Sequence, residues 1–293
     1  MGVRCDGRGQ EPESHPDRDV NKAVKFSIVL STHHTSFAAL AFRGDLNANL
    51  SRIASYGYDG VELAVRDASL VNSTEIRRLV SSAGLEVSAV GTGQAWGEDR
   101  LSLVDDDWSV RKKAVERLFG HIDLAADLDA VLIIGLVRGV VRGTPSVAVR
   151  ELLLDGLRSI AAKAAQSGVK IAIEPINRYE TSLINTVSEG LDILGQLGAR
   201  NVGLLIDTFH MNIEEPSIEK SIRQCSGRIF HFHVADSNRR YPGAGHLDFP
   251  SILRALAETD YGGYISGEFL PLPSPEEAAQ RAIESLKAYV TEV

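Results

Sequence analysis

The chain has 293 residues, 44% of them hydrophobic and 24% charged, which is typical of a folded enzyme-sized protein and excludes a collagen-like, low-complexity or wholly disordered chain. Asp and Glu number 39 against 31 Lys and Arg, and because the resulting formal charge of -8 repels phosphate backbones, we expect no nucleic-acid partner. The two cysteines, Cys5 and Cys225, are too few for a disulfide scaffold, and no apolar stretch reaches the roughly 18 residues needed to cross a bilayer, so we expect a cytoplasmic protein with no membrane partner.

The first segment of the chain contains glycine, proline and alternating charges but few apolar side chains. Ordering such a segment costs conformational entropy that no buried core would offset. We therefore predict a disordered N-terminal tail over residues 1–24, followed by a single domain over residues 25–293.

Beyond this segment, short runs rich in β-branched residues alternate with amphipathic stretches of helical period, a pattern typical of βα units around a parallel sheet. The predicted strands cover residues 26–30, 60–65, 85–91, 130–135, 169–174, 202–207, 228–234 and 263–269. Such units close most simply into a (β/α)8 TIM barrel, with a doubly wound open sheet as the alternative. In a barrel, functional residues lie where the strands end.

The predicted helices between the strands begin with capping residues. Asn72 precedes one amphipathic stretch, and Thr186 with Glu189 three residues later forms the capping-box pattern before another. Ser274 followed by Pro275 begins the last helix, with proline at its first position. Burial of the apolar stripes of these helices against the sheet is the main force expected to hold the fold together.

Four successive predicted strands end in a side chain that can bind a metal: Glu174, Asp207, His233 and Glu268. A single acidic residue after a strand is usually a helix cap or a surface charge. Three carboxylates meeting inside a barrel mouth, however, would repel one another and lose their solvation, a conflict that a divalent cation resolves. Mostly oxygen donors with one imidazole suit Mn²⁺ or Mg²⁺ better than structural zinc, and we therefore predict a metal site.

Further polar residues lie near these strand ends. His231 shares a strand face with the predicted histidine ligand, and packing in the core is its favoured interpretation. His210 lies just past its strand and is expected to contact the substrate, with orientation of a neighbouring group as the alternative. Glu180 and Arg239 lie in loops beyond the predicted ligands, where a solvated loop charge is equally compatible with the sequence.

The motifs at the strand ends are EPINRYE over 174–180, DTFHMNIEE over 207–215, HFH over 231–233 and GEF over 267–269. In residues, order and spacing they resemble the ketose 3-epimerase group, D-tagatose 3-epimerase-like, of the xylose-isomerase-like TIM barrels. The resemblance extends from about residue 26 to the C-terminal helix. Within the group, the segments GTGQ over 91–94 and HVADSNR over 233–239 are most similar to the 5-keto-L-gluconate epimerases.

The resemblance implies a divalent-metal-dependent isomerase that inverts the carbon next to the ketone of a small ketose or keto-sugar acid, with 5-keto-L-gluconate as a candidate, through a cis-enediolate. It implies one ion, Mn²⁺ before Mg²⁺ or Co²⁺, on the same four ligands, with Glu174 and Glu268 as acid and base. Glu180, His210 and Arg239 would hold the substrate. Possible pocket-lining residues are His33, Glu62, Gln94 and Trp96. We also expect a homo-oligomer, either a dimer or a tetramer.

Other functions are compatible with the sequence. An aldose–ketose or hydroxypyruvate-type isomerase would use the same site but move the proton between carbons 1 and 2, and a keto-inositol dehydratase would lose a hydroxyl. DNA-repair enzymes of the endonuclease IV type resemble this chain at Glu174, Asp207, His210, His233, His246 and Glu268. Their trinuclear zinc site, however, requires histidines at the ends of strands two and three, where residues 62–66 and 91–94 contain none. A carbohydrate-binding barrel without activity is the non-enzymatic alternative.

Overall fold

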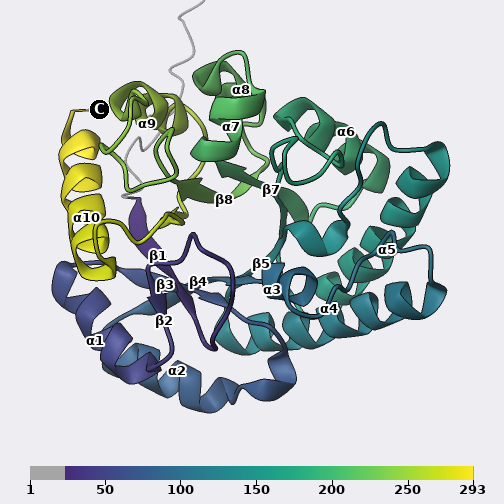
Figure 1. The fold of residues 1–293 in the computed structure, drawn as a ribbon, viewed down its shortest axis with the longest axis horizontal. Helices are drawn as coiled ribbons and strands as arrows, with labels where there is room; N and C mark the ends of the chain where they lie inside the picture. Colours follow the sequence, from purple (N-terminus) through teal and green to yellow (C-terminus); the bar gives the residue numbers. More distant parts are fainter. Residues whose placement is uncertain (1–23, 293) are drawn as a thin grey trace, which may run out of the picture.

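The computed structural model describes residues 24–292, and its strands form a closed parallel barrel (Figure 1). Strand β1 (Lys25–Ser31) pairs with both β3 (Gly60–Ala64) and β9 (Tyr264–Gly267), and this double pairing closes the ring. Between β3 and β9 the strands follow in chain order as β4 (Glu86–Gly91), β5 (Val131–Ile134), β6 (Ile171–Ile173), β7 (Val202–Asp207) and β8 (Ile229–Val234). The predicted (β/α)8 barrel is therefore confirmed, and the open sheet is excluded.

Every predicted strand is present, with its ends within two residues of the predicted bounds. The structure adds one short strand that was not predicted, β2 (Phe42–Arg43), which pairs with the end of β1. The disordered tail predicted over residues 1–24 lies outside the described residues except for Val24.

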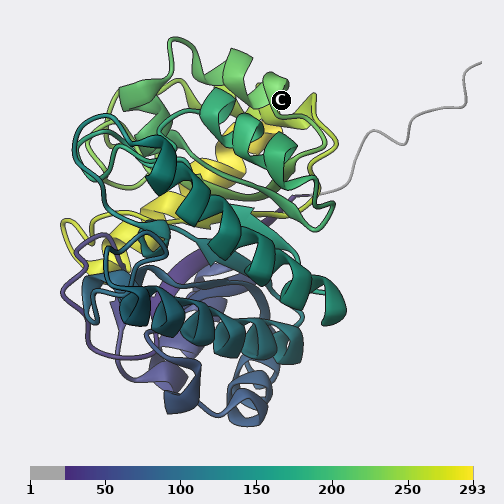
Figure 2. The same ribbon diagram turned by 90° about the vertical axis from the view of Figure 1, so that its right-hand side faces the viewer.

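A ring of helices surrounds the barrel (Figure 1, Figure 2). The longer helices are α1 (Leu46–Tyr56), α2 (Ser73–Ser82), α4 (Trp108–Leu128), α5 (Val147–Gln166), α6 (Val187–Leu197), α9 (Phe249–Ala257) and α10 (Pro275–Thr291). Shorter ones are α3 (Gly93–Gly97), α7 (Thr208–Glu214), α8 (Ile218–Gln224) and the 3₁₀ turns η1 (Ala68–Leu70) and η2 (Leu136–Arg138). Over residues 24–292, none of the helices has the length and apolar character needed to traverse a bilayer.

The predicted helix starts are confirmed by their capping contacts. The Asn72 side chain accepts a hydrogen bond at the start of α2, and Thr186 and Glu189 form a reciprocal capping box at the start of α6. Ser274 caps α10, which has Pro275 in its first turn. These contacts join residues at most three positions apart, and local sequence therefore suffices to predict them.

The outer faces of the strands pack against the helices, and the inner faces line the barrel. In β1, for example, Phe26, Ile28 and Leu30 belong to the large apolar core under the helices. Ser27 and Ser31 alternate with them, so they point into the barrel, where both are fully buried. Because both faces are buried, the strand is not simply amphipathic.

The interior of the barrel is divided into an apolar side and a polar side. The apolar side is a separate buried cluster of Ala89, Ile133, Ala172 and Leu205, which come from β4 to β7. The polar side contains Ser27, Glu62, His231 and Ser266, which come from β1, β3, β8 and β9. Polar groups removed from water are stable when they have partners, and His231 and Ser266 are hydrogen-bonded to Glu62 within the barrel, whereas the Ser27 hydroxyl has no partner in residues 24–292.

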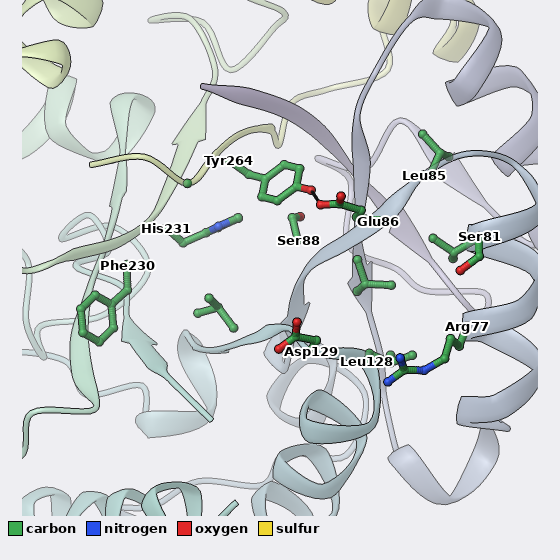
Figure 3. Close-up of a pocket in the computed structure, with 14 residues that line it drawn as sticks. Arg77, Ser81, Leu85, Glu86, Ser88, Leu128, Asp129, Phe230, His231 and Tyr264 are labelled. Atoms are coloured by element: carbon green, nitrogen blue, oxygen red, sulfur yellow. Dashed lines mark hydrogen bonds between the residues drawn. The ribbon is translucent and has the colours of Figure 1, made fainter. Parts of the chain in front are cut away.

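A cavity of about 360 Å³ opens at the amino-terminal end of the strands (Figure 3). Its wall includes Glu86, Ser88, Tyr264 and the buried His231. The Tyr264 hydroxyl donates a hydrogen bond to the Glu86 carboxylate, and Lys25 Nζ donates to the same carboxylate at 2.6 Å. This cavity lies at the end of the barrel opposite to the strand ends that carry the predicted metal ligands.

The apolar side of the interior generates a stability prediction. Leu205 is fully buried, so Leu205→Ala removes packed methyl groups and leaves a cavity, and we expect the free energy of unfolding to fall by about 2–5 kcal/mol. Leu70 is 55% exposed, and Leu70→Ala is the matched control, with an expected change within about 0.5 kcal/mol. Urea unfolding of the two variants measures both values. Equal losses in the two variants would contradict the packing described for the barrel interior.

Candidate metal centre and active site

The ends of four neighbouring strands bring the predicted metal-binding side chains together. Glu174 follows β6, Asp207 ends β7, His233 lies near the end of β8 and Glu268 follows β9. One ligand atom from each residue lies within 4.8 Å of those of the other three. The first three residues are buried and Glu268 is partly buried. The four side chains therefore form one cluster that could hold a metal ion.

Asp207 serves two structural purposes. Its Oδ1 accepts hydrogen bonds from the backbone N–H groups of Phe209 at 2.7 Å and His210 at 3.3 Å, and in this way it caps α7. Its Oδ2 lies 3.8 Å from Nδ1 of His233, beyond hydrogen-bonding distance. The helix cap, expected for an isolated acidic residue, thus coexists with membership of the cluster.

The ring of His233 has one satisfied and one unsatisfied nitrogen. Nε2 lies 2.8 Å from Oε2 of Glu62, whereas Nδ1 is buried and has no hydrogen-bond partner within residues 24–292. A buried unpaired nitrogen is costly, and it requires an explanation such as an ion. An imidazole lone pair beside three carboxylates is a donor set that fits a divalent cation.

The loop after β5 makes room for Glu174. A Cβ atom on Gly135 would lie 2.9 Å from Oε2 of Glu174, so a larger residue would displace the carboxylate. The fully buried guanidinium of Arg138 donates hydrogen bonds to the carbonyl oxygens of Gly135 at 2.9 Å, Leu183 at 2.8 Å and Ile184 at 3.1 Å. Arg138 therefore joins the loop after β5, at Gly135, to the loop after β6, at Leu183 and Ile184. The sequence did not predict this role.

The surroundings of the three carboxylates shift their pKa values in different directions. Burial, followed by the negative charge of Glu268, raises the pKa of Glu174 well above its usual range. Burial likewise raises the pKa of Glu268 to about 7, although the nearby His233 lowers it. Burial would also raise the pKa of Asp207, but His210 and His233 outweigh it and hold that pKa below its usual range. The two glutamates thus hold protons more readily than Asp207, and a cation would favour their ionised forms.

The orientation of His210 follows from its neighbour Asn177. Oδ1 of Asn177 accepts a hydrogen bond from the Tyr179 backbone N–H at 3.0 Å, which directs its Nδ2 to Nδ1 of His210 at 2.7 Å and to Oε1 of Glu180 at 3.1 Å. Nδ1 of His210 is therefore an acceptor, and the ring proton lies on Nε2, which is 3.6 Å from Oε1 of Glu174. His210 thus presents an N–H donor to the cluster. Asn177, given no role from the sequence, positions two predicted substrate contacts.

Arg239 joins the predicted substrate residues to the cluster. Its Nη1 donates to Oε1 of Glu180 at 3.1 Å, and its Nη2 donates to Oε2 of Glu268 at 3.4 Å. The guanidinium carbon lies 4.9 Å from the ring centroid of Phe209 and 5.4 Å from that of Phe37, so the group is stacked between aromatic rings. Burial lowers the pKa of Arg239, but Glu268 and then Glu180 outweigh it and raise that pKa. Arg239 is a paired cation rather than a solvated loop charge.

A cavity of about 290 Å³ opens over the cluster at the carboxyl ends of the strands. Its wall includes Glu62, Gln94 and Trp96, three of the four residues expected to line a pocket. The fourth, His33, is not among the described residues that border this cavity, and its ring Nδ1 lies 2.9 Å from the hydroxyl of the adjacent Thr32. His231 is buried in the barrel and hydrogen-bonded to Glu62, consistent with the core position expected for it.

One residue shared with the repair-enzyme alternative lies elsewhere. His246 is exposed, and its Nδ1 lies 2.9 Å from the hydroxyl of Ser237. It belongs to neither of the groups of potential metal ligands found in residues 24–292. In the described part of the chain, His246 is therefore not a member of the cluster of Glu174, Asp207, His233 and Glu268.

Comparison with known proteins agrees with this architecture. The model of the xylose isomerase-like TIM barrel family matches residues 50–289. The chain is 32% identical over 239 residues to the L-ribulose 3-epimerase of Methylomonas sp. (strain DH-1), covering 78% of this chain and 82% of that protein. It is 32% identical over 232 residues to the D-psicose 3-epimerase of Ruminiclostridium cellulolyticum, covering 76% and 78%.

A solved structure extends the similarity to three dimensions. The crystal structure of D-allulose 3-epimerase from Methylomonas sp. in complex with D-allulose matches with a TM-score of 0.78 and 26% sequence identity, covering 92% of this chain and 98% of that chain. The family-model match over residues 50–289 begins after β1 and includes all four clustered side chains. The chain therefore belongs to the xylose isomerase-like TIM barrel family and is related within it to ketose 3-epimerases.

Proposed function

We propose that the protein is a metal-dependent sugar epimerase that inverts the carbon next to the ketone of a small ketose or keto-sugar acid. The observation that carries this proposal is the convergence of Glu174, Asp207, His233 and Glu268 beneath a cavity, with a buried and unpaired histidine nitrogen among the carboxylates. The relatedness to ketose 3-epimerases supports the reaction class.

The same four side chains would hold one divalent ion. Three carboxylates and one imidazole favour Mn²⁺, with Mg²⁺ or Co²⁺ as alternatives. When bound, the ion supplies Lewis-acid stabilisation of the negative charge that develops on the ketone oxygen and the adjacent hydroxyl oxygen of the substrate. Asp207 has one oxygen engaged at the start of α7, so Oδ2 is the atom that it offers.

Glu174 and Glu268 transfer the protons in this proposal. Epimerisation removes a proton from the carbon next to the ketone and returns one from the opposite face, which requires one ionised and one protonated group. In the metal-free protein, burial raises the pKa of Glu268 to about 7 and that of Glu174 well above its usual range, and this buried setting opposes the tendency of a bound cation to keep both groups ionised. The two glutamates exchange roles when the reaction starts from the other epimer.

Three further residues hold the substrate. The N–H of His210 at Nε2, fixed by Asn177, donates to a substrate oxygen, and Arg239 with its partner Glu180 binds the hydroxyl groups beside the reacting carbon. The finer assignment to 5-keto-L-gluconate rests on the segments at residues 91–94 and 233–239. Oligomeric state and a cytoplasmic location stay predictions from the sequence.

Proton exchange with solvent tests the reaction. We expect ketopentoses, ketohexoses or ketohexonates incubated with the protein and Mn²⁺ in deuterated water to gain deuterium at the carbon next to the ketone, C3 of a 2-ketose, together with formation of the epimer. NMR locates the label. Deuterium at C1 with an aldose product would instead indicate an isomerase, and loss of water would indicate a dehydratase. Binding of a sugar without any exchange would indicate a carbohydrate-binding barrel.

The acid and base are tested by isosteric substitution. At saturating Mn²⁺, Glu174→Gln or Glu268→Gln should lower kcat at least about a hundredfold, because each variant loses one proton-transfer group. Glu151→Gln is the matched control, since Glu151 is exposed on α5 and should leave kcat unchanged. Near-full activity in either of the first two variants removes that residue from the mechanism.

The raised pKa of Glu268 also predicts that the stability of the metal-free protein depends on pH. Burial raises the pKa of Glu268 from its ordinary value of 4.5 to about 7, so the folded protein binds a proton at Glu268 more tightly than the unfolded chain does. The resulting stabilisation of the fold is complete below about pH 4.5 and is lost as the pH rises through about 7. The chelator-treated protein should therefore have a lower Tm at pH 8 than at pH 6, and Glu268→Gln should reduce this difference.

Added metal should offset that loss. Mn²⁺ at about a hundredfold its Kd should stabilise the protein by about 2.7 kcal/mol, and more Mn²⁺ is needed at pH 6, where protons compete for the glutamates. Thermal unfolding at both pH values, with chelator or Mn²⁺, measures the effect. A Tm indifferent to Mn²⁺ at both pH values would contradict the metal centre.

A further inference from the structure

A single carboxylate oxygen in the middle of the barrel accepts three hydrogen bonds. Oε2 of Glu62 lies 2.8 Å from Nε2 of His231, 2.8 Å from Nε2 of His233 and 2.9 Å from the hydroxyl of Ser266. The four residues come from β3, β8 and β9, and each is at most 2% exposed. We call these four residues the Glu62 clamp.

The clamp contains no open place for an ion between its members. Glu62, His231 and His233 lie close enough to form a potential ligand group. However, their N···O distances of 2.8 Å are those of direct hydrogen bonds, so the three groups already satisfy one another. A buried carboxylate is stable only when it is paired and hydrogen-bonded, and its three donors meet that requirement. The clamp is therefore a hydrogen-bonded support and not a second metal site.

The bond to Glu62 determines which nitrogen of His233 faces the strand ends. A carboxylate oxygen that accepts from Nε2 keeps the ring proton on Nε2, so the lone pair lies on Nδ1. Nδ1 is the buried atom without a partner in the described residues, and it lies 3.8 Å from Oδ2 of Asp207. The hydrogen bond to Glu62, which is not a member of the metal cluster, thus leaves Nδ1 of His233 free to bind a metal and directs it toward the cluster.

We propose that Glu62 is a positioning residue, which holds the ring of His233 with Nδ1 directed at the metal centre and is itself held by His231 and Ser266. This inference rests on the proposed function. The geometry shows how the support is built: Glu62 and His233 border the cavity over the cluster, whereas His231 borders the cavity at the opposite end (Figure 3). The clamp therefore crosses the barrel from one cavity to the other.

Substitution of Glu62 by glutamine tests the positioning role. Glu62→Gln keeps the size of the side chain but offers an amide with one acceptor oxygen to three donors. We expect its Mn²⁺ affinity, measured by isothermal titration of the chelator-treated protein, to fall about 10- to 100-fold, as is typical when a group that supports a metal ligand is lost. Glu98→Gln is the control for loss of one negative charge on the wall of the same cavity. The Glu98 carboxylate accepts hydrogen bonds from the hydroxyls of Thr35 and Ser36 and not from a residue of the metal cluster. This control variant should keep its Kd within about twofold.

A spectroscopic readout separates positioning from general stability. In the Mg²⁺-loaded wild-type protein, ¹H–¹⁵N NMR of the histidine rings should show His233 protonated on Nε2, with its proton shifted downfield by the carboxylate. Glu62→Gln should move that proton upfield. The wild-type measurement does not depend on whether a variant folds, and protonation of His233 on Nδ1 would overturn the proposal.

The outcomes also separate this inference from the proposed function. Wild-type protein that binds Mn²⁺ and exchanges substrate protons, with an unchanged Kd and an unchanged His233 signal in Glu62→Gln, refutes the positioning role alone. Absence of Mn²⁺ binding to the wild-type protein refutes both proposals. A weakened Kd in Glu62→Gln, with an unchanged Kd in Glu98→Gln and the shifted His233 signal, supports the positioning role.

Discussion

The concentration of negative charge at one end of the barrel is the constraint on which the rest of the site depends. Glu174, Asp207 and Glu268 each place a carboxylate within a few ångströms of the others, out of bulk water. The protein offsets this charge unequally: Asp207 receives two backbone N–H groups, and Glu268 receives a guanidinium. Within residues 24–292 Glu174 accepts no such hydrogen bond, and burial, followed by the charge of Glu268, raises its pKa. A divalent cation could neutralise all three carboxylates at once, because one ligand atom of each lies within 4.8 Å of the others.

The two sides of the barrel interior have different structural roles. The apolar side, around Leu205, fills space between β4 and β7 and needs no partners. The polar side comes from β1, β3, β8 and β9, and its residues Glu62 and Ser266 form hydrogen bonds beneath the cluster. The same barrel therefore combines ordinary core packing with a polar support under the candidate active site.

The sequence predicts most of the scaffold because its signals are local. The strands follow from short β-branched runs, and Thr186 with Glu189 marks a helix start within four positions. The cluster was predictable because parallel strands of a barrel bring their carboxyl ends to one rim.

The long-range hydrogen bonds of the site could not be predicted from the sequence. The bond between Glu62 and His233 joins residues 171 positions apart. It depends on strand registers that shift near Glu62 and Leu205, so no local sequence pattern indicates it. Asn177 likewise acquires its role only when His210, 33 positions away, lies beside it.

The two oxygens of Asp207 have a consequence for how this position can evolve. One begins α7, the helix that carries His210, and the other faces His233. A longer glutamate would push its carboxylate away from the helix start, and an asparagine would keep the cap but remove the negative charge that faces His233. Position 207 therefore meets two structural requirements, the cap in the first turn of α7 and the charge of the cluster, and neither glutamate nor asparagine would meet both.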